Sequence, residues 1–418
     1  FVLTMRVAAA MRERSRSPRQ LPALSGRIRA TDAPCIVQMQ RMLRGKQGLL
    51  SLAQGVVHWA PPEKAVAMAV AAAGTPAVNS YGADEGDPDL LQALKDKLQE
   101  VNNLSNQAVM VTAGANQAFL NLAHAVVNPG EKCVLFAPYY FNHMMALQMS
   151  AAEVVVGPCK REGAALVPDL EWLETQCSSD SPPVLIVLCT PNNPSGTVYP
   201  RPVLEAAREL ATRCGAWLAV DNTYEDFTYG VSHAAVAGPN VANLFSFSKA
   251  YGMMGWRMGY VAYPEGRADL TEAMLKAQDT TVICPPRVSQ VVAKAALEAG
   301  PAWVREQIEA TVVKNRTTVT AALAAALGEA SIVGGTGAIY LMAELPPARG
   351  GPADDRAVVE WLAEEHKVVL IPGSACGSPG WVRVAFANLE PGVCAEAARR
   401  MEAGLTALVE GQGPGGAQ

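Results

Sequence analysis

Long apolar runs and an excess of charge of either sign are both missing from this sequence. No apolar run approaches the roughly 20 residues that a helix needs to cross a bilayer. The longest, residues 65–73, is short and rich in Ala, and we expect it to form a buried helix. The formal net charge is only −5, so no general attraction for nucleic acid or for an anionic membrane is expected. Any anion-binding site must therefore be local.

Cysteine and histidine lack the spacing of a disulfide framework or a metal site. The nine cysteines are scattered between Cys35 and Cys394 with no C-x-x-C pair, which predicts neither disulfides nor zinc. This usage is typical of a reducing compartment. The five histidines are dispersed and show no ligand spacing. We therefore predict surface or core histidines and no metal.

Both ends of the chain differ in composition from the rest. Residues 1–32 place arginines among Ser, Ala and Pro, with Glu13 the only acidic residue before Asp32. This composition fits a transit peptide, and it equally fits a disordered basic arm. The chain begins at Phe1 rather than Met, which is consistent with a fragment or a conceptual extension. Residues 411–418 are rich in Gly and Pro and are expected to form a disordered tail.

Short β-rich runs alternate with helical ones between about residues 108 and 287. Residues 184–188 are all apolar, the pattern of a strand buried on both faces. This alternation predicts a mostly parallel sheet with helices on both faces. Strands are expected at 109–112, 133–136, 184–188, 216–220 and 243–247, and helices at 116–127, 141–150 and 202–214.

After about residue 287 the pattern changes. A stretch rich in Ala and Val predicts helix as far as residue 327, and shorter strands are expected at 338–343, 368–371 and 381–386. This arrangement is typical of a smaller α+β domain. We expect an N-terminal segment that packs with the small domain at 33–60, a large domain at 61–287 and the small domain at 288–410.

Lys249 stands among small residues directly after a predicted strand. A single lysine is usually a solvated surface group, but Ser246 lies three residues before it and Arg257 eight residues after it. An amine forms an imine with an aldehyde, while a hydroxyl and a guanidinium bind a phosphate. The grouping suits an aldehyde cofactor that carries a phosphate.

Other polar residues also follow predicted strands, and ligands of open α/β sheets bind beyond the carboxyl ends of strands. Small residues at 112–116 let backbone N–H groups approach a phosphate, although Asn116 equally fits an ordinary helix N-cap. Asp221 ends an apolar strand, where an unpaired carboxylate is costly. A protonated pyridine nitrogen would be a suitable partner for it.

Three more residues carry hydrogen-bonding groups that suit such a ligand. Tyr224 and Asn193 are placed to bind a phenolic oxygen, although residues 193–196 alone fit a simple turn. Arg383 is a cation within the apolar run 381–386 and needs a partner. A bidentate substrate carboxylate and an internal salt bridge fit Arg383 equally well.

Taken together, these motifs resemble those of the class I pyridoxal-phosphate aminotransferases. Four of them occur in the family's order: N-P-[ST]-G at 193–196, D-x-x-Y at 221–224, S-x-S-K at 246–249 and an arginine near the end. Each motif is weak alone, but the combination is specific and spans residues 31–409. Within the family, residues 51–59, 80–86 and 246–260 are similar to the plant aromatic aminotransferases. Those enzymes act on aromatic amino acids and methionine with 2-oxo acids.

The resemblance implies an α/β fold like that of aspartate aminotransferase, with a large domain built on a mostly parallel sheet and a smaller α+β domain. It implies pyridoxal 5'-phosphate as cofactor, held as a Schiff base on Lys249, which also carries protons. Asp221 would pair with the pyridine nitrogen, and Asn193 and Tyr224 would bind the phenolate oxygen. The remaining cofactor ligands would be the backbone at Ala115 and Asn116, the side chains of Ser246 and Arg257 at the phosphate, and Tyr140 stacked on the ring.

The resemblance also implies substrate contacts and a partner. Gly55, Trp59 and Asn193 are expected near the substrate, and Arg383 is expected to bind its α-carboxylate. Tyr81 matches a tyrosine that reaches the phosphate of the neighbouring subunit, which implies an obligate homodimer with no nucleic-acid or membrane partner. The plant relatives are cytosolic, so a cytoplasmic location is expected, with the plastid as the alternative if residues 1–32 are a transit peptide.

Two departures from the family pattern bear on the substrate. Asn116 stands where members that use aspartate often carry Lys, and Gly55-Val56-Val57-His58 replaces the usual Gly-x-Pro-Asp. We therefore predict ping-pong transamination between an aromatic or methionine-like amino acid and a 2-oxo acid. The alternatives are an aspartate- or glutamate-preferring aminotransferase, a carbon–sulfur β-lyase on the same scaffold and a non-enzymatic regulator. The regulator is disfavoured because the residues before Thr31 are too few for a DNA-binding helical segment.

Overall fold

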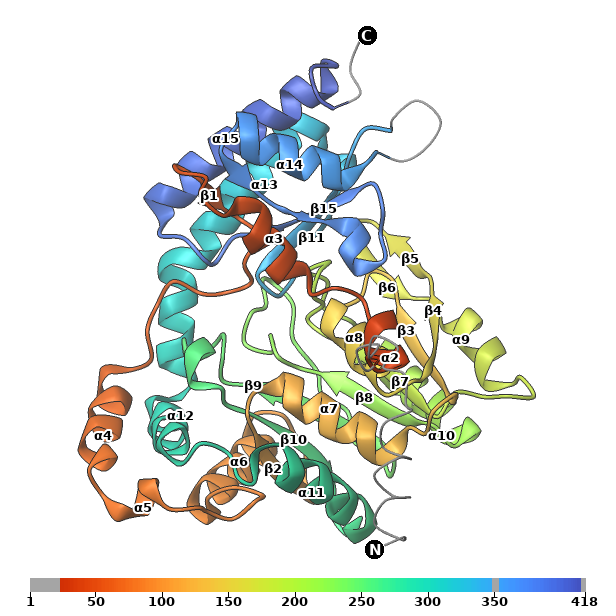
Figure 1. Cartoon of the computed structure of the whole chain (residues 1–418), viewed down its shortest axis with the longest axis vertical. Coiled ribbons are helices and arrows are strands. Elements are labelled where there is room, and N and C mark those ends of the chain that lie inside the picture. Colours follow the sequence, from red (N-terminus) through yellow and green to blue (C-terminus); the bar gives the residue numbers. More distant parts are fainter. Residues whose placement is uncertain (1–22, 348–352, 415–418) are drawn as a thin grey trace, which may run out of the picture.

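The computed structural model describes residues 23–347 and 353–414 (Figure 1). Most of the predicted basic arm and the end of the predicted tail, residues 1–22 and 415–418, lie outside the described residues. The described part of the arm carries a short exposed helix, α2 (Gly26–Ala30).

The larger part of the molecule is built on a seven-stranded sheet. Its strands are β2 (Gln107–Thr112), β3 (Lys132–Phe136), β4 (Glu153–Gly157), β7 (Leu185–Cys189), β8 (Trp217–Asp221), β9 (Val241–Ser246) and β10 (Gly259–Pro264). They lie in the order β2-β10-β9-β8-β7-β3-β4, and only β10 runs antiparallel to its neighbours. The predicted mostly parallel sheet is confirmed, and β7 is buried along its whole length, as its apolar run indicates.

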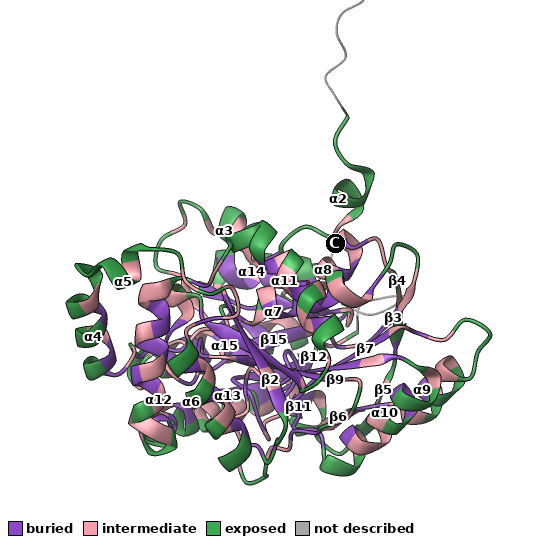
Figure 2. Ribbon diagram, turned by 90° about the horizontal axis from the view of Figure 1, so that it is seen from below, coloured by how far each residue is buried: buried purple, intermediate pink, exposed green. Residues whose placement is uncertain are grey.

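Helices cover both faces of this sheet. One face packs against α7 (Ala115–Val126), α8 (Phe141–Met149) and α11 (Ala268–Val282). The other packs against α6 (Pro88–Glu100), α9 (Leu170–Cys177), α10 (Arg201–Cys214) and the first half of α12 (Arg287–Gln307). Successive residues of β7 alternate between the two faces, as the pleat requires. Figure 2 shows most of these strands buried between helices whose outer faces are exposed, whereas the edge strand β4 is mostly not buried.

A second, antiparallel sheet has four strands. In spatial order these are β11 (Ile332–Gly334), β12 (Tyr340–Glu344), β15 (Trp381–Ala385) and β14 (Ile371–Pro372). The sheet packs with α13 (Val313–Leu327), α14 (Asp355–Glu365) and α15 (Pro391–Val409). In its register, Met342 of β12 is opposite Arg383 of β15, and Tyr340 is opposite Ala385. Tyr340 and Arg383 are therefore diagonal neighbours on the same face.

The strand predicted at 368–371 is in fact two short strands with different partners. Strand β13 (Val368–Val369) pairs in parallel with β1 (Leu50–Ser51), whereas β14 joins β15. One continuous strand could not pair with both. The pairing with β1 fastens the N-terminal segment beside the smaller sheet.

The helical stretch predicted from 287 to 327 is interrupted. Gly300 has a φ of 74°, outside the helical range, and it is followed by Pro301. Proline disfavours the helical conformation of the residue before it, which explains the break. A π-helical turn, η2 (Ile308–Val312), then leads into α13. The first half of α12 packs against α6 and α4 (Glu63–Ala73), within the core of the larger sheet.

The prediction of a buried helix at 65–73 is wrong for one face of α4. Ala65 and Ala69 are buried, but Met68 and Val70 are 38% and 73% exposed. Alanines at a spacing of four residues form a narrow buried stripe and leave the other positions outside. Nowhere in residues 23–347 and 353–414 is a helix long and apolar enough to cross a membrane. The remaining short elements are α3 (Cys35–Leu43), α5 (Pro76–Asn79), β5 (Cys159–Glu162), β6 (Ala165–Pro168), η1 (Met254–Trp256), η3 (Glu329–Ser331) and η4 (Gly373–Cys376).

Candidate active site

A cavity of about 220 Å³ opens at the carboxyl ends of β8 and β9, and its lining includes residues of β12 and β15. This is the position at which open α/β sheets bind ligands. Its lining includes most of the residues predicted for the site: Gly55, Ala115, Asn116, Tyr140, Asn193, Asp221, Tyr224, Ser246, Lys249, Arg257 and Arg383. Trp59 and Tyr81 are not among the lining residues.

Lys249 lies in the loop that follows β9. Its Nζ donates a hydrogen bond to the backbone carbonyl of Gly55, and no carboxylate of the described chain pairs with it. Burial, followed by the positive charges of Arg257 and Arg383, lowers the pKa of Lys249 to about 8. Roughly a tenth of the amine is therefore in the free, nucleophilic form at pH 7, far more than at the usual pKa of a lysine.

The N-terminus of α7 and Arg257 together form an anion-binding corner. Gly114 precedes the helix with a φ of 86°, so the alternative that made Asn116 the N-cap is wrong. A Cβ at Gly114 would lie 2.3 Å from Nη2 of Arg257, so the guanidinium needs a glycine there. Within the described chain, the guanidinium of Arg257 donates only to the backbone carbonyls of Met254 and Ala113. Its charge is left for a ligand, beside the free N–H groups of the first helical turn.

Asp221 is 4% exposed at the end of β8 and is held by two protein donors. His143 of α8 lies 3.1 Å from Oδ2, and the backbone N–H of Thr223 donates to Oδ1 over 2.9 Å. Burial, the largest single influence, raises the pKa of Asp221, but His143 and the hydrogen bonds of Thr223 together outweigh it and hold this pKa below its usual range. Asp221 therefore stays a carboxylate.

Sequence reasoning missed this role of His143, which it treated only as a surface or core histidine. One signal was available, because His143 follows Tyr140 by three residues at the start of a predicted helix. Residues at that spacing share a helical face. A histidine on the face of a site residue is a candidate for the site.

Arg383 is 1% exposed and has no carboxylate partner among the described residues. Its Nη1 donates to Oδ1 of Asn193 over 3.0 Å and its Nη2 to the carbonyl of Ala53 over 2.6 Å, while Nε has no partner. The internal salt bridge that the sequence left open is therefore not found in this part of the chain. Because Asn193 accepts from Arg383 through its oxygen, its amide nitrogen remains a donor toward the cavity.

Tyr224 and Tyr340 meet across the cavity floor. Their hydroxyl oxygens are 2.6 Å apart, and both side chains are buried. Burial raises the pKa of Tyr224 well above its usual value, so it stays protonated. Tyr340 also places its ring 4.4 Å from the guanidinium of Arg383. Sequence reasoning did not single out Tyr340, whose position depends on the register of β12 against β15.

The two aromatic residues predicted near the ligand are placed differently. Tyr140 lines the cavity and donates to Oδ1 of Asn116 over 3.3 Å. Trp59 instead stacks on Phe227 and donates from Nε1 to the carbonyl of Ala250 over 3.2 Å. The structure thus places Trp59 in the core rather than on the cavity wall, because its flat ring finds an apolar partner there.

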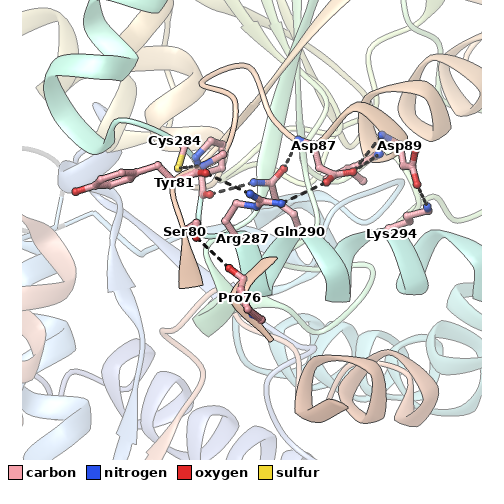
Figure 3. Close-up of polar contacts among 12 residues, drawn as sticks. Pro76, Ser80, Tyr81, Asp87, Asp89, Cys284, Arg287, Gln290 and Lys294 are labelled. Carbon is pink, nitrogen blue, oxygen red and sulfur yellow. Dashed lines mark hydrogen bonds and ion pairs between the residues drawn. The ribbon is translucent and has the colours of Figure 1, made fainter. Parts of the chain in front are cut away.

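Tyr81 does not line the chain's own cavity, and its side chain is 77% exposed. Figure 3 shows the contacts that hold its loop. Nη1 of Arg287 donates to the carbonyl of Tyr81 over 3.3 Å, and the N–H of Gly82 donates to Sγ of Cys284 over 3.4 Å. The loop is fixed by these contacts, while the phenol ring is presented to the outside.

The charge of the cavity fits a ligand with more than one negative group. Lys249, Arg257 and Arg383 line it without a carboxylate partner in the described chain, and Asp221, the only carboxylate in the lining, is paired with His143. The Nε of Arg383 is a buried donor without an acceptor in the described chain, so it is available to a ligand. A phosphate at Arg257, an aldehyde at Lys249 and a cationic ring nitrogen at Asp221 match this arrangement, so the residues fit pyridoxal phosphate.

Metal chemistry finds no support in the described residues. No group of three or more His, Cys, Asp or Glu side chains in 23–347 and 353–414 is arranged to hold an ion. All nine cysteines are free, from Cys35 to Cys394.

Comparison with known proteins finds relatives along most of the chain. Residues 47–401 match the family model described as aminotransferase class I and II. The chain is 46% identical to Aromatic aminotransferase ISS1 of Arabidopsis thaliana over 389 residues, covering 92% of this chain and 97% of that protein. It is 30% identical to the aspartate/prephenate aminotransferase of Thermus thermophilus, covering 88% and 95%.

The fold is also that of solved aminotransferases. A double mutant of Thermus thermophilus aspartate aminotransferase superimposes with a TM-score of 0.82 at 27% identity, covering 92% of this chain and all of that one. The chain therefore belongs to the class I and II aminotransferases, and it is a pyridoxal-phosphate-dependent aminotransferase with the α/β fold of aspartate aminotransferase.

Proposed function

We propose that this enzyme moves the amino group of an aromatic or methionine-like amino acid to a 2-oxo acid, with Lys249 as the residue that holds the cofactor and carries the proton. The observation that carries the proposal is the partly buried amine of Lys249 in a cavity with two further cations and no free carboxylate. The relative at 46% identity is named an aromatic aminotransferase, which supports the donor class.

The cofactor would be held by the residues already placed around the cavity. Arg257, Ser246 and the backbone N–H groups of Ala115 and Asn116 would bind its phosphate, and Tyr140 would lie on its ring. Asp221 would keep the ring nitrogen protonated, since His143 holds the carboxylate in its charged form. Once bound, pyridoxal phosphate supplies an electron-accepting ring that stabilises negative charge at the substrate Cα.

Lys249 is suited to take up the Cα proton and return it elsewhere. Its pKa of about 8 leaves part of it as free amine near neutral pH. A base whose pKa lies near the working pH both accepts and releases protons effectively. The carbonyl of Gly55 accepts a hydrogen bond from Nζ, which holds the amine in the cavity.

Donor and acceptor would use the same small space in turn. Both substrates carry an α-carboxylate. Once Arg257 binds phosphate and Lys249 acts as base, Arg383 with its unpartnered Nε is the cation left for this carboxylate among the described residues of the lining. A cavity of about 220 Å³ with one such arginine holds one substrate at a time. The first product therefore leaves before the acceptor binds, which gives ping-pong kinetics.

The residues that line the cavity support the expected preference for aromatic and methionine-like donors. Among the described residues, no cation lines the cavity beyond Lys249, Arg257 and Arg383, and its apolar lining includes Ile36, Val56 and Phe141. A neutral pocket cannot compensate a desolvated side-chain carboxylate, whereas an apolar side chain gains about 25 cal/mol per Å² of buried area.

Aromatic amino acids and methionine are therefore expected to exceed aspartate as donors in kcat/KM by roughly tenfold or more. Asn116→Lys is expected to raise kcat/KM for aspartate by about 10- to 150-fold, the worth of one hydrogen bond to a charged group. The measurement compares phenylalanine, tryptophan, methionine, aspartate and glutamate with a common 2-oxo acid.

Asn116→Gln is the matched neutral control and should leave the donor order unchanged. If aspartate is the best donor of the unsubstituted enzyme, the neutral-pocket argument is wrong. Ammonia and pyruvate released from cystathionine would instead reveal carbon–sulfur β-elimination at the same site.

The enzyme is also proposed to act as a homodimer in which Tyr81 serves the partner's cofactor. The phenol is exposed and does not line its own cavity, although its loop is fixed. Val282 and Ile283, at the end of α11 and next in sequence to Cys284, are also exposed apolar residues. An apolar surface beside a fixed, outward tyrosine suits burial against a second subunit.

Tyr81→Phe is expected to raise the dissociation constant of pyridoxal phosphate by about 10- to 150-fold, because one hydrogen bond to the phosphate is lost. The dimer should persist, because the ring remains. Cofactor binding is measured by dialysis and absorbance, and the assembly state by sedimentation. A fully active monomer, or unchanged cofactor affinity, would contradict the role of Tyr81.

A further inference from the structure

Tyr340 occupies the centre of the site without a role in the function proposed so far. It is 1% exposed in β12, lines the cavity, and its hydroxyl has a single hydrogen-bond partner in the described chain. That partner is the hydroxyl of Tyr224 at 2.6 Å, and either oxygen can be the donor.

The neighbours of Tyr340 leave its hydroxyl little freedom to move. An added Cβ at Gly55 would lie 1.7 Å from the hydroxyl oxygen, so only glycine leaves room for it. On the other side the ring lies 4.4 Å from the guanidinium of Arg383. The phenol is thus fixed between Gly55, whose carbonyl accepts a hydrogen bond from Lys249, and Arg383, which is proposed to bind the substrate carboxylate.

The number of protons decides the direction of the bond between the two tyrosines. A tyrosine hydroxyl has one proton to donate and two lone pairs to accept with. In the proposed function Tyr224 donates its proton to the phenolic oxygen of the cofactor. Once that proton is committed, the 2.6 Å contact persists as a hydrogen bond only if Tyr340 is the donor.

We propose that Tyr340 is a positioning residue that donates its hydroxyl hydrogen bond to Tyr224 and so directs the proton of Tyr224 at the cofactor. This inference rests on the proposed function, because it assumes that Tyr224 meets the cofactor oxygen. Hydrogen bonds in a chain polarise one another, so donation from Tyr340 strengthens the donation by Tyr224. Tyr340 acts through Tyr224 and moves no proton of the substrate itself.

A measurable consequence is the pH at which the lysine–cofactor linkage loses its proton. The cofactor oxygen carries its full negative charge only after that loss. A donor to the oxygen therefore favours the deprotonated linkage and lowers its pKa. The visible absorbance of the bound cofactor reports this titration without any substrate.

Tyr340→Phe is expected to raise the pKa of this titration by roughly 0.5–1 unit, the worth of one neutral hydrogen bond. Tyr224→Phe should raise it further, because the direct donor is lost. In the double variant, removal of Tyr340's hydroxyl should add nothing to the effect of Tyr224→Phe, because Tyr340 acts only through Tyr224. A titration unchanged in Tyr340→Phe, or additive shifts in the double variant, would overturn the proposal.

The matched control is Tyr229→Phe. Tyr229 donates from its hydroxyl to the carbonyl of Ala338 over 2.8 Å, outside the cavity lining, so its loss should leave the titration unchanged. Thermal denaturation of each variant separates loss of folding from loss of positioning. If the unsubstituted protein binds pyridoxal phosphate through another lysine, the proposed function fails. If it binds through Lys249 and only the Tyr340→Phe titration is unchanged, Tyr340 alone loses its assigned role.

Discussion

Lys249→Ala is expected to lower kcat for every amino donor by at least about 10²–10⁴-fold, the usual contribution of a positioned general acid–base. No other lysine lines the cavity, so no second amine of the described chain replaces it. The cofactor should still bind, because Arg257, Ser246 and the N-terminus of α7 remain. Steady-state kinetics together with a cofactor titration measure the two effects separately.

A small amine added to Lys249→Ala should restore part of the activity, since the space of the side chain and the carbonyl of Gly55 are both left in place. Lys276→Ala is the control, because Lys276 is exposed and its one ion-pair partner among the described residues is Glu272. Activity within tenfold of the unsubstituted enzyme would mean that another group transfers the proton.

Arg383→Ala is expected to lower kcat/KM for all donors and acceptors by a similar factor of about 10²–10⁴. Two charge-assisted hydrogen bonds to a carboxylate contribute about 3–6 kcal/mol together, and each 1.4 kcal/mol is tenfold. Because every substrate carries the α-carboxylate, the ratio between donors should hardly change. The donor comparison described above is repeated with the variant to measure this.

Arg383→Lys is the informative companion, because it keeps the charge but loses the planar fork. It should recover only a small part of the loss. Arg383→Ala also removes the donors to Oδ1 of Asn193 and to the carbonyl of Ala53. The folding of this variant is therefore checked by thermal denaturation. A fall confined to aspartate and glutamate would place Arg383 at the side chain of the substrate instead.

The part of the fold that local pattern controls was predictable. The apolar run of β7 and the turn residues after β8 and β9 identify strands that end at a ligand site. Lys249, Asp221 and Asn193 could be found because each is a polar residue at the end of such an apolar strand or in the loop directly after it. Their meeting in one cavity follows from the parallel order of the strands.

What escaped prediction depends on contacts between distant segments. Tyr340 reads as an ordinary core residue until the register of β12 against β15 sets it beside Arg383. Trp59 is an aromatic residue of the kind that lines pockets, but its ring stacks on Phe227 instead. The split of residues 368–371 depends on pairing with β1, more than three hundred residues earlier. Tertiary partners decide each of these cases, and periodicity carries no information about them.

The most direct test of the account is to reduce the purified, cofactor-loaded enzyme with borohydride and to map the modified peptide by mass spectrometry. The account predicts an enzyme that absorbs visible light before reduction and carries the pyridoxyl group on Lys249 afterwards. Lys249→Ala should bind the cofactor but retain no label. A pyridoxyl group on any other lysine, or no cofactor at all, would contradict the assignment of Lys249 on which the mechanism rests.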